Sequence, residues 1–247
     1  KEKNKSETLI PVTEKSASRA SGSAPHPLCD KLKYLAGDYK EYTGEDNTKY
    51  YTDYINQLRD WVKSEYTNQK IQAIYTYLSN QSLISVDENN RLTDKWEKCT
   101  EKLSAGNQAD AFIRFRVISE DNPVSAVWQD RELQQNYIDY YLSLLKNEEF
   151  CYISGKIKNC TINHPSKIRN SGDKAKLISA NDKSGFTFRG RFISSDQAAQ
   201  VGYDVSQKAH NALKWLIQKQ GRTFGSKVFL LWGTNNEKTA NLTDDTF

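Results

Sequence analysis

The segment from residue 176 to residue 193, KLISANDKSGFTFRGRFI, constrains the fold of this chain more than any other stretch. From Gly185 onward its side chains alternate between two chemically opposed sets, which is typical of a β-strand. One face carries the aromatic residues Phe186, Phe188 and Phe192, and the other carries Thr187, Arg189 and Arg191. The pattern predicts a strand over 186–193 with its phenylalanines in a core. The polar run 181–185 predicts the turn that precedes it.

The arginine face of this strand has two interpretations. It is either an ordinary solvated face or a surface of fixed positive charge suited to a polyanion. The net charge of the chain is +4, but region 155–227 holds 14 Lys/Arg against 4 Asp/Glu, a local net of +10 that leaves −6 for the remainder. A basic block of this kind favours contact with nucleic-acid phosphates, although a charge run is often only a solvated face.

Strand and helix patterns alternate along the chain in a way that predicts an α+β fold. Strand patterns occur at 8–12, 111–119, 150–153, 176–180, 186–193 and 228–232. Region 46–106 has helical periodicity and is predicted to be an inserted helical subdomain. In the 111–119 segment, Ile113, Phe115 and Val117 share one face, and Phe112, Arg114 and Arg116 share the other. We therefore expect a mixed, mainly antiparallel sheet in which 176–193 pairs as a hairpin.

Two amphipathic helices are predicted in the second half of the chain. The helix at 130–146 is expected to bury Leu133, Tyr137, Tyr140, Tyr141 and Leu144. The helix at 204–220 is expected to begin at a cap formed by Asp204 or Ser206 and to end at Gly221. Its predicted buried stripe is Val205, Ala209, Leu213, Leu216 and Ile217. A different face carries Lys208, Asn211, Trp215 and Lys219 at steps of three and four residues, which suits either phosphates and base edges or plain solvation.

The composition of segment 13–28, TEKSASRASGSAPHPL, predicts a loop, because the segment has too few apolar residues to pack on itself. One interpretation is a floppy surface loop. The other is a loop that contacts a nucleic-acid backbone or groove through Lys15, Ser16, Ser18 and Arg19, because hydroxyls, backbone N–H groups and cations position phosphates.

The sequence lacks the common catalytic motifs, and we expect no enzymatic activity, no metal and no cofactor. Cys151, Cys160 and His164 match no common zinc-site spacing, and a fourth ligand is missing. The four cysteines are too scattered for a disulfide framework, so we expect reduced thiols. His164 beside Lys167 and Arg169 leaves open a metal-independent ribonuclease, although a lone histidine in a loop is more often structural. No apolar run is long enough to span a membrane, and we expect a cytoplasmic protein.

A family resemblance rests on three segments of the chain. They are TEKSASRASGSAPHPLCDKLKYLAGDY, LISANDKSGFTFRGRF, and SQKAHNALKWLIQKQG with LLWG shortly after it. In order and spacing they resemble the large subunit of the type I-C CRISPR surveillance complex, Cascade (the Cas-eight-c or Csd-one family). The resemblance implies that residues 1–247 are an N-terminal fragment of a longer, non-catalytic subunit. It also implies contacts with crRNA, with Cas-five-type and Cas-seven-type subunits, with target double-stranded DNA and, at the interference stage, with the Cas-three helicase-nuclease.

The implied function is recognition of the protospacer-adjacent motif (PAM) in duplex DNA, while the guide RNA reads the remaining sequence by pairing. For DNA contact we expect Lys15, Ser18, Arg19, Asn181 and Lys183. For backbone phosphates or the crRNA–protein junction we expect Arg189, Arg191, Lys208 and Asn211. Two alternatives remain at this point, namely the crRNA-processing ribonuclease and a purely structural scaffold subunit.

Overall fold

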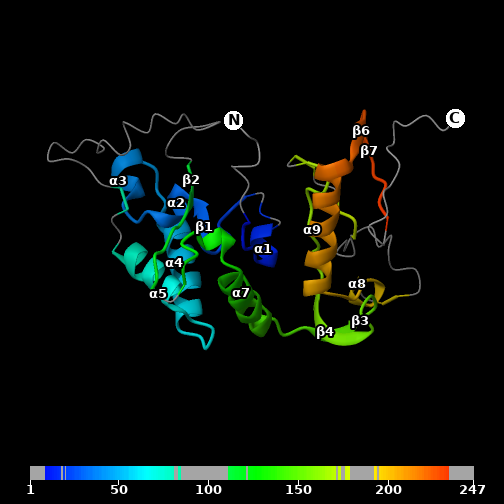
Figure 1. Cartoon of the computed structure of the whole chain (residues 1–247), viewed down its shortest axis with the longest axis horizontal. Helices are drawn as coiled ribbons and strands as arrows, with labels where there is room; N and C mark the ends of the chain where they lie inside the picture. The colour runs from blue at the N-terminus through cyan, green and yellow to red at the C-terminus, as the bar shows by residue number, and fades with distance from the viewer. Residues whose placement is uncertain are drawn as a thin grey trace. The chain divides into compact units, whose positions relative to one another are not determined.

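The computed structural model of the chain describes residues 9–17, 19, 21–80, 83–84, 111–120, 122–170, 172–173, 176–178, 192–193 and 195–233. The chain divides into two compact units, residues 1–144 (unit 1) and 145–247 (unit 2). Each unit combines helices with short antiparallel sheets, so the fold is mixed α+β, as predicted (Figure 1). No helix in the described part of the chain has both the length and the apolar character needed to cross a bilayer.

The described residues of unit 1 are mainly helical and include one two-stranded sheet. Its elements are α1 (Glu14–Ala17), β1 (Cys29–Lys31), α2 (Leu32–Leu35), α3 (Tyr39–Thr43), α4 (Thr48–Val62), α5 (Gln69–Ser79), β2 (Phe112–Arg114), the 3₁₀ helix η3 (Val127–Gln129) and α7 (Arg131–Leu144). Strands β1 and β2 are antiparallel, with Cys29 opposite Arg114 and Lys31 opposite Phe112. Helices α4 and α5 lie within region 46–106, where the sequence has helical periodicity, while residues 85–106 lie outside the described part.

The core of unit 1 is aromatic and joins α4 to α7. Trp61 is 1% exposed and stacks on Tyr140 with ring centroids 5.6 Å apart. Its indole Nε1 donates to the side chain of Asn136 at 3.1 Å, so the buried N–H is satisfied. Tyr137 and Tyr140 are thus buried, as predicted for the helix at 130–146. In α7 the prediction for Leu144 was wrong, because this last helical residue is half exposed.

A buried ion pair fixes the segment that leads into α7. Lys70 of α5 contacts the carboxylate of Asp130, and both side chains are at least 95% buried. Lys70 Nζ also donates to the carbonyl of Val124 at 2.7 Å, and Asp130 accepts from the backbone N–H of Leu133 at 3.1 Å. Asp130 therefore caps the first turn of α7 while its charge is balanced from α5.

The described residues of unit 2 form a three-stranded sheet, one long helix and a two-stranded hairpin after that helix. Its elements are β3 (Glu148–Cys151), β4 (Lys156–Thr161), α8 (Ser195–Ala198), β5 (Val201–Gly202), α9 (Tyr203–Gln220), β6 (Arg222–Phe224) and β7 (Lys227–Phe229). The sheet order is β3-β4-β5 with antiparallel neighbours, and β6 pairs with β7 through a turn at Gly225, whose φ is +59°. That left-handed conformation favours glycine.

Several predicted strands differ from the structure. The residues at 9–12 and 176–178 are not strands, and neither segment has a described partner strand to pair with. The strand at 150–153 lies earlier, at Glu148–Cys151, and the strand at 228–232 is the short β7. Strand β4 was not predicted, because its sequence KIKNCT is largely polar and only its last two residues are buried. Most of the predicted strand at 186–193 and its turn lies outside the described residues, and Phe192 and Ile193 themselves are not in a strand.

Candidate nucleic-acid interface

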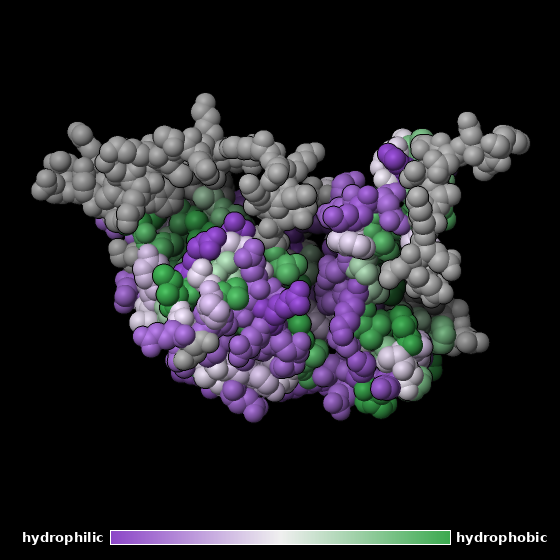
Figure 2. Space-filling view, in the orientation of Figure 1, coloured by the Kyte–Doolittle hydropathy of each residue, from purple (hydrophilic) through white to green (hydrophobic). Residues whose placement is uncertain are grey.

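The solvent-exposed side of α9 carries the residues that the sequence placed on one face. Lys208, Asn211, Trp215 and Lys219, here called the α9 polar face, are all exposed, and Trp215 retains 57% of its surface. Hydrophilic side chains follow α9 along much of its length in Figure 2. An exposed indole between two lysines combines a stacking surface with mobile positive charge.

The β6–β7 hairpin continues this chemistry directly after the helix. Arg222 and Lys227 are exposed, as are Phe224 and Phe229, which form an edge-to-face pair with centroids 5.7 Å apart. The sequence pattern predicted only a last strand at 228–232 and not the hairpin. The signal was present as Gly225 between two short runs of alternating cationic and aromatic residues.

The junction between α9 and the hairpin depends on Gly221. Its φ of −67° is ordinary for any residue, so glycine is not needed there for a left-handed turn. Instead, a Cβ at this position would lie 2.5 Å from the carbonyl oxygen of Ile217. The predicted helix end was therefore at the right residue, but close approach of the backbone is the physical reason for it.

The buried side of α9 is polar, which corrects the predicted apolar stripe. The buried residues are Tyr203, Ser206 and His210, whereas Ala209 is exposed and Leu213 is only partly buried. His210 Nδ1 lies 2.7 Å from the carbonyl oxygen of Ser206, which it reaches as an N–H donor one turn back. Serine and histidine are hydrophilic, so hydropathy alone places them on the surface. The sequence pattern therefore predicted that the neighbouring apolar stripe, which begins at Val205, is the buried side.

His164 links α9 to the loop after β4. Its ring is 1% exposed, its Nδ1 lies 2.9 Å from Ser206 Oγ, and it stacks on His210 with centroids 6.0 Å apart. Burial, with a smaller effect from His210, lowers the pKa of His164 to about 4. His164 is therefore neutral at physiological pH. It is also enclosed, with Ser206 as a hydrogen-bonding partner.

An ion pair secures the start of α9 to the sheet. Lys158 of β4 donates to the carboxylate of Asp204 at 2.6 Å. Burial opposes ionisation, but the Lys158 hydrogen bond and charge outweigh it and lower the pKa of Asp204. The N-cap residue is Gly202 and not Asp204 or Ser206, so the predicted cap was wrong. Asp204 instead fixes the helix orientation relative to β4.

The cysteines of unit 2 are free thiols buried in the sheet. Backbone N–H groups of Gly202 and Ser154 point at Cys151 Sγ from 3.2 and 3.5 Å. Although burial raises the thiol pKa, hydrogen bonds from Ser154 (side chain and backbone) and from the backbone of Gly202 lower it to about 7. In the described part of the chain, no three metal-binding side chains gather into a possible metal site.

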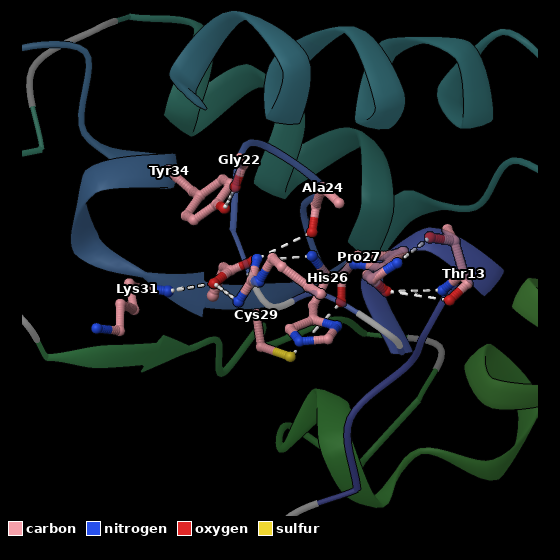
Figure 3. A network of polar contacts seen from close by, with 11 residues as sticks. Thr13, Gly22, Ala24, His26, Pro27, Cys29, Lys31 and Tyr34 are labelled. Atoms are coloured by element: carbon pink, nitrogen blue, oxygen red, sulfur yellow. Dashed lines mark hydrogen bonds and ion pairs between the residues drawn. The ribbon is translucent and has the colours of Figure 1, made fainter. Parts of the chain in front are cut away.

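The predicted contact residue Arg19 is engaged inside unit 1. It belongs to the network of polar contacts that includes Ala24, His26 and Lys31 (Figure 3). Its guanidinium donates to both carboxylate oxygens of Asp30, at 2.7 and 3.0 Å, and to the carbonyl of Ala24 at 2.9 Å. The same carboxylate accepts the backbone N–H groups of His26 and Lys31, at 2.8 and 2.7 Å. This network holds the segment leading into β1 in a defined path, so the segment is not a floppy loop.

Some of the remaining predicted contact residues lie in the part of the chain that the structure describes, and others lie outside it. Lys15 is exposed on α1, a single helical turn where a loop was expected. Ser16 of the same turn is buried, and its Oγ accepts the backbone N–H of Thr13 at 2.8 Å. Lys208 and Asn211 are exposed on the same helix, α9. Ser18, Asn181, Lys183, Arg189 and Arg191 lie outside the described residues, so their predicted roles stay predictions.

Comparison with known protein families places these features in context. The family described as CRISPR-associated protein (Cas_Csd1) matches residues 1–247. The chain therefore belongs to the Csd1 family of CRISPR-associated proteins and is a Cascade subunit of type I-C. No curated protein matches the chain.

Proposed function

We propose that this chain is a non-catalytic, nucleic-acid-binding part of the type I-C surveillance complex and recognises the PAM in target double-stranded DNA. The observation that carries the proposal is the α9 polar face together with the cations of the adjoining hairpin. Lys208, Lys219, Arg222 and Lys227 are all exposed, and none forms an ion pair with a described residue. Surface cations without carboxylate partners are available to replace counterions on phosphates.

The same surface offers a group that can discriminate bases. Asn211 lies between Lys208 and Trp215 on the exposed helix face. An asparagine amide can both donate to and accept from the major-groove edge of adenine, a contact worth about 1–3 kcal/mol of discrimination. We assign Lys208 and Lys219 to backbone phosphates and Asn211 to the base edge. In this proposal the protein recognises only the short PAM, and the guide RNA recognises the rest of the target by base pairing, as in other CRISPR effector complexes.

The surroundings of His164 weigh against the ribonuclease alternative. A general acid or base must come within hydrogen-bonding reach of the bond that it acts on. His164 is almost fully buried, and its Nδ1 already faces Ser206. We therefore assign His164 a structural role.

We further propose that the chain is cytoplasmic and that its partners are crRNA, the Cas-five-type and Cas-seven-type subunits and, at the interference stage, the Cas-three helicase-nuclease.

The test is duplex binding by the assembled complex, measured by fluorescence anisotropy across about 50–200 mM salt. The Lys208→Ala/Lys219→Ala variant should bind more weakly, and the slope of log K against log[salt] should fall by about 1.8, or about 0.9 per phosphate contact. The matched control is Lys49→Ala/Lys63→Ala, which removes two exposed lysines of unit 1. Equal slopes for the two double variants would contradict the proposed interface.

A second variant separates motif recognition from backbone contact. Asn211→Ala should reduce the preference for a PAM-containing duplex by about 5- to 150-fold, which corresponds to 1–3 kcal/mol, and leave the salt slope unchanged. An unchanged preference would remove Asn211 from PAM recognition. If PAM preference is also absent from the wild-type complex, the scaffold alternative replaces the proposal.

A further inference from the structure

A second cationic surface lies in unit 1, on the exposed face of the strand that contains β2. Ile113, Phe115 and Val117 point to one side and pack against the core. Phe112, Arg114 and Arg116 alternate with them and are exposed on the other side. This alternation was predicted from the sequence, but the function proposed above makes no use of it.

Both arginines converge on one indole ring. The guanidinium carbon of Arg114 lies 3.7 Å from the ring centroid of Trp128, and that of Arg116 lies 5.1 Å away. The ring belongs to η3, whose position is fixed by a β-bridge between Arg116 and Ala126. The backbone N–H of Val127 also donates to the carbonyl of Phe115 at 3.3 Å. The backbone thus holds the ring beside the strand, and the arginines are ordered by the ring.

Among the described residues, no carboxylate neutralises the charge on this pair. Arg19 and Arg169 each form a two-pronged ion pair with an aspartate. Within the described part of the chain, no carboxylate lies within ion-pair distance of Arg114 or Arg116, and the hydrogen bond found for them joins Arg116 Nη1 to Ser125 Oγ at 3.4 Å. Stacking on Trp128 uses the flat face of a guanidinium and leaves the N–H donors at its edge available.

We propose that Phe112, Arg114 and Arg116 form a binding site for single-stranded nucleic acid, in which the arginines bind phosphates and Phe112 stacks on a base. Phe112 is 41% exposed and lies two residues, or about 7 Å, from Arg114 on the same strand face. An exposed aromatic ring beside ordered cations is the arrangement that binds unpaired strands. A duplex would offer phosphates to the arginines but no accessible base face to Phe112, and so the site selects a single strand.

This site goes beyond the proposed function, because it lies in the other unit and selects an unpaired strand. The experiment therefore uses the full chain carrying Lys208→Ala/Lys219→Ala, so that remaining binding is not dominated by the α9 polar face. The probes are fluorescein-labelled oligothymidine and oligouridine, with a duplex of equal length as comparison. Oligothymidine and oligouridine distinguish DNA from RNA as the source of the strand.

In this background, Arg114→Ala/Arg116→Ala should lower the salt slope for single strands by about 1.4, or about 0.7 for each phosphate contact. Phe112→Ala should weaken single-strand binding about tenfold and leave duplex binding unchanged. The matched controls are Arg131→Ala, an exposed arginine of α7, and Tyr77→Ala, an aromatic residue of α5 that is 55% exposed. Neither control should change the affinity for a single strand.

Three results would overturn the proposal. The first is that Arg114→Ala/Arg116→Ala binds single strands with the same affinity as Arg131→Ala, while thermal unfolding shows that both variants are folded. The second is an equal effect of Phe112→Ala on duplex and single strand. The third is arginine-dependent binding of polyglutamate as tight as that of either oligonucleotide, which would assign the surface to an acidic protein partner.

Discussion

Acidification provides a direct test of the buried polar contact between α9 and the loop after β4. The ordinary pKa of a histidine side chain is 6.5, and in the folded chain burial lowers the pKa of His164 to about 4. The unfolded chain therefore binds a proton more readily than the folded chain. The stability contributed by neutral His164 is complete above about pH 6.5 and is lost as the pH falls through about pH 4.

The size of the effect follows from the same two pKa values. A difference of roughly 2.5 pH units corresponds to about 3 kcal/mol of stability, and about 2 kcal/mol of it is lost between about pH 7 and pH 5. Carboxylates with lowered pKa, such as Asp204, titrate below this window. The interval from about pH 7 to pH 5 thus reports mainly on histidine protonation.

The assay is urea unfolding at several pH values, followed by a brief deuterium pulse at one fixed pH and mass spectrometry of peptides from α9. Wild-type α9 should lose about 2 kcal/mol of protection between about pH 7 and pH 5, while His164→Gln should lose much less, because glutamine does not titrate. His26→Gln, in unit 1, should behave like wild type in α9. Parallel pH curves for wild type and His164→Gln would refute the assignment of the pH dependence to His164.

Three further substitutions test the ion pairs and the helix end. Arg19→Ala should cost unit 1 about 3 kcal/mol in urea unfolding, because it leaves Asp30 buried without its partner, and a loss below about 1 kcal/mol would contradict this. Lys70→Met should cost about 3–5 kcal/mol for the same reason, and an unchanged unfolding midpoint would count against it. Gly221→Ala should destabilise α9 by about 1–3 kcal/mol, since its Cβ would collide with the Ile217 carbonyl; unchanged α9 protection in hydrogen exchange would disprove the collision.

The long helices were predictable from the sequence because their periodicity is strong over many residues. The prediction of 204–220 differs from the observed Tyr203–Gln220 by one residue at its start. The alternation in AFIRFRVIS likewise gave the correct inner and outer faces around β2. In these cases the local pattern and the tertiary packing favour the same arrangement.

The failures arise where tertiary contacts decide the structure. The buried face of α9 is polar because His164 comes from 42 residues earlier in the chain to meet Ser206, a contact that no local pattern reveals. Arg19 pairs with Asp30 in the same way, so a residue predicted to contact DNA also serves the fold. The segment at 9–12 has the composition of a strand but no described strand beside it to pair with.

The central claim is that duplex DNA contacts unit 2 through the α9 polar face. The most direct measurement is photo-crosslinking of the assembled complex to a PAM-containing duplex with 5-iodouracil beside the motif, followed by peptide mapping. We predict crosslinks to peptides within 203–229, which contain Trp215, Phe224 and Phe229, and their loss in Lys208→Ala/Lys219→Ala. Crosslinks confined to peptides outside 203–229, in both wild type and variant, would contradict the account.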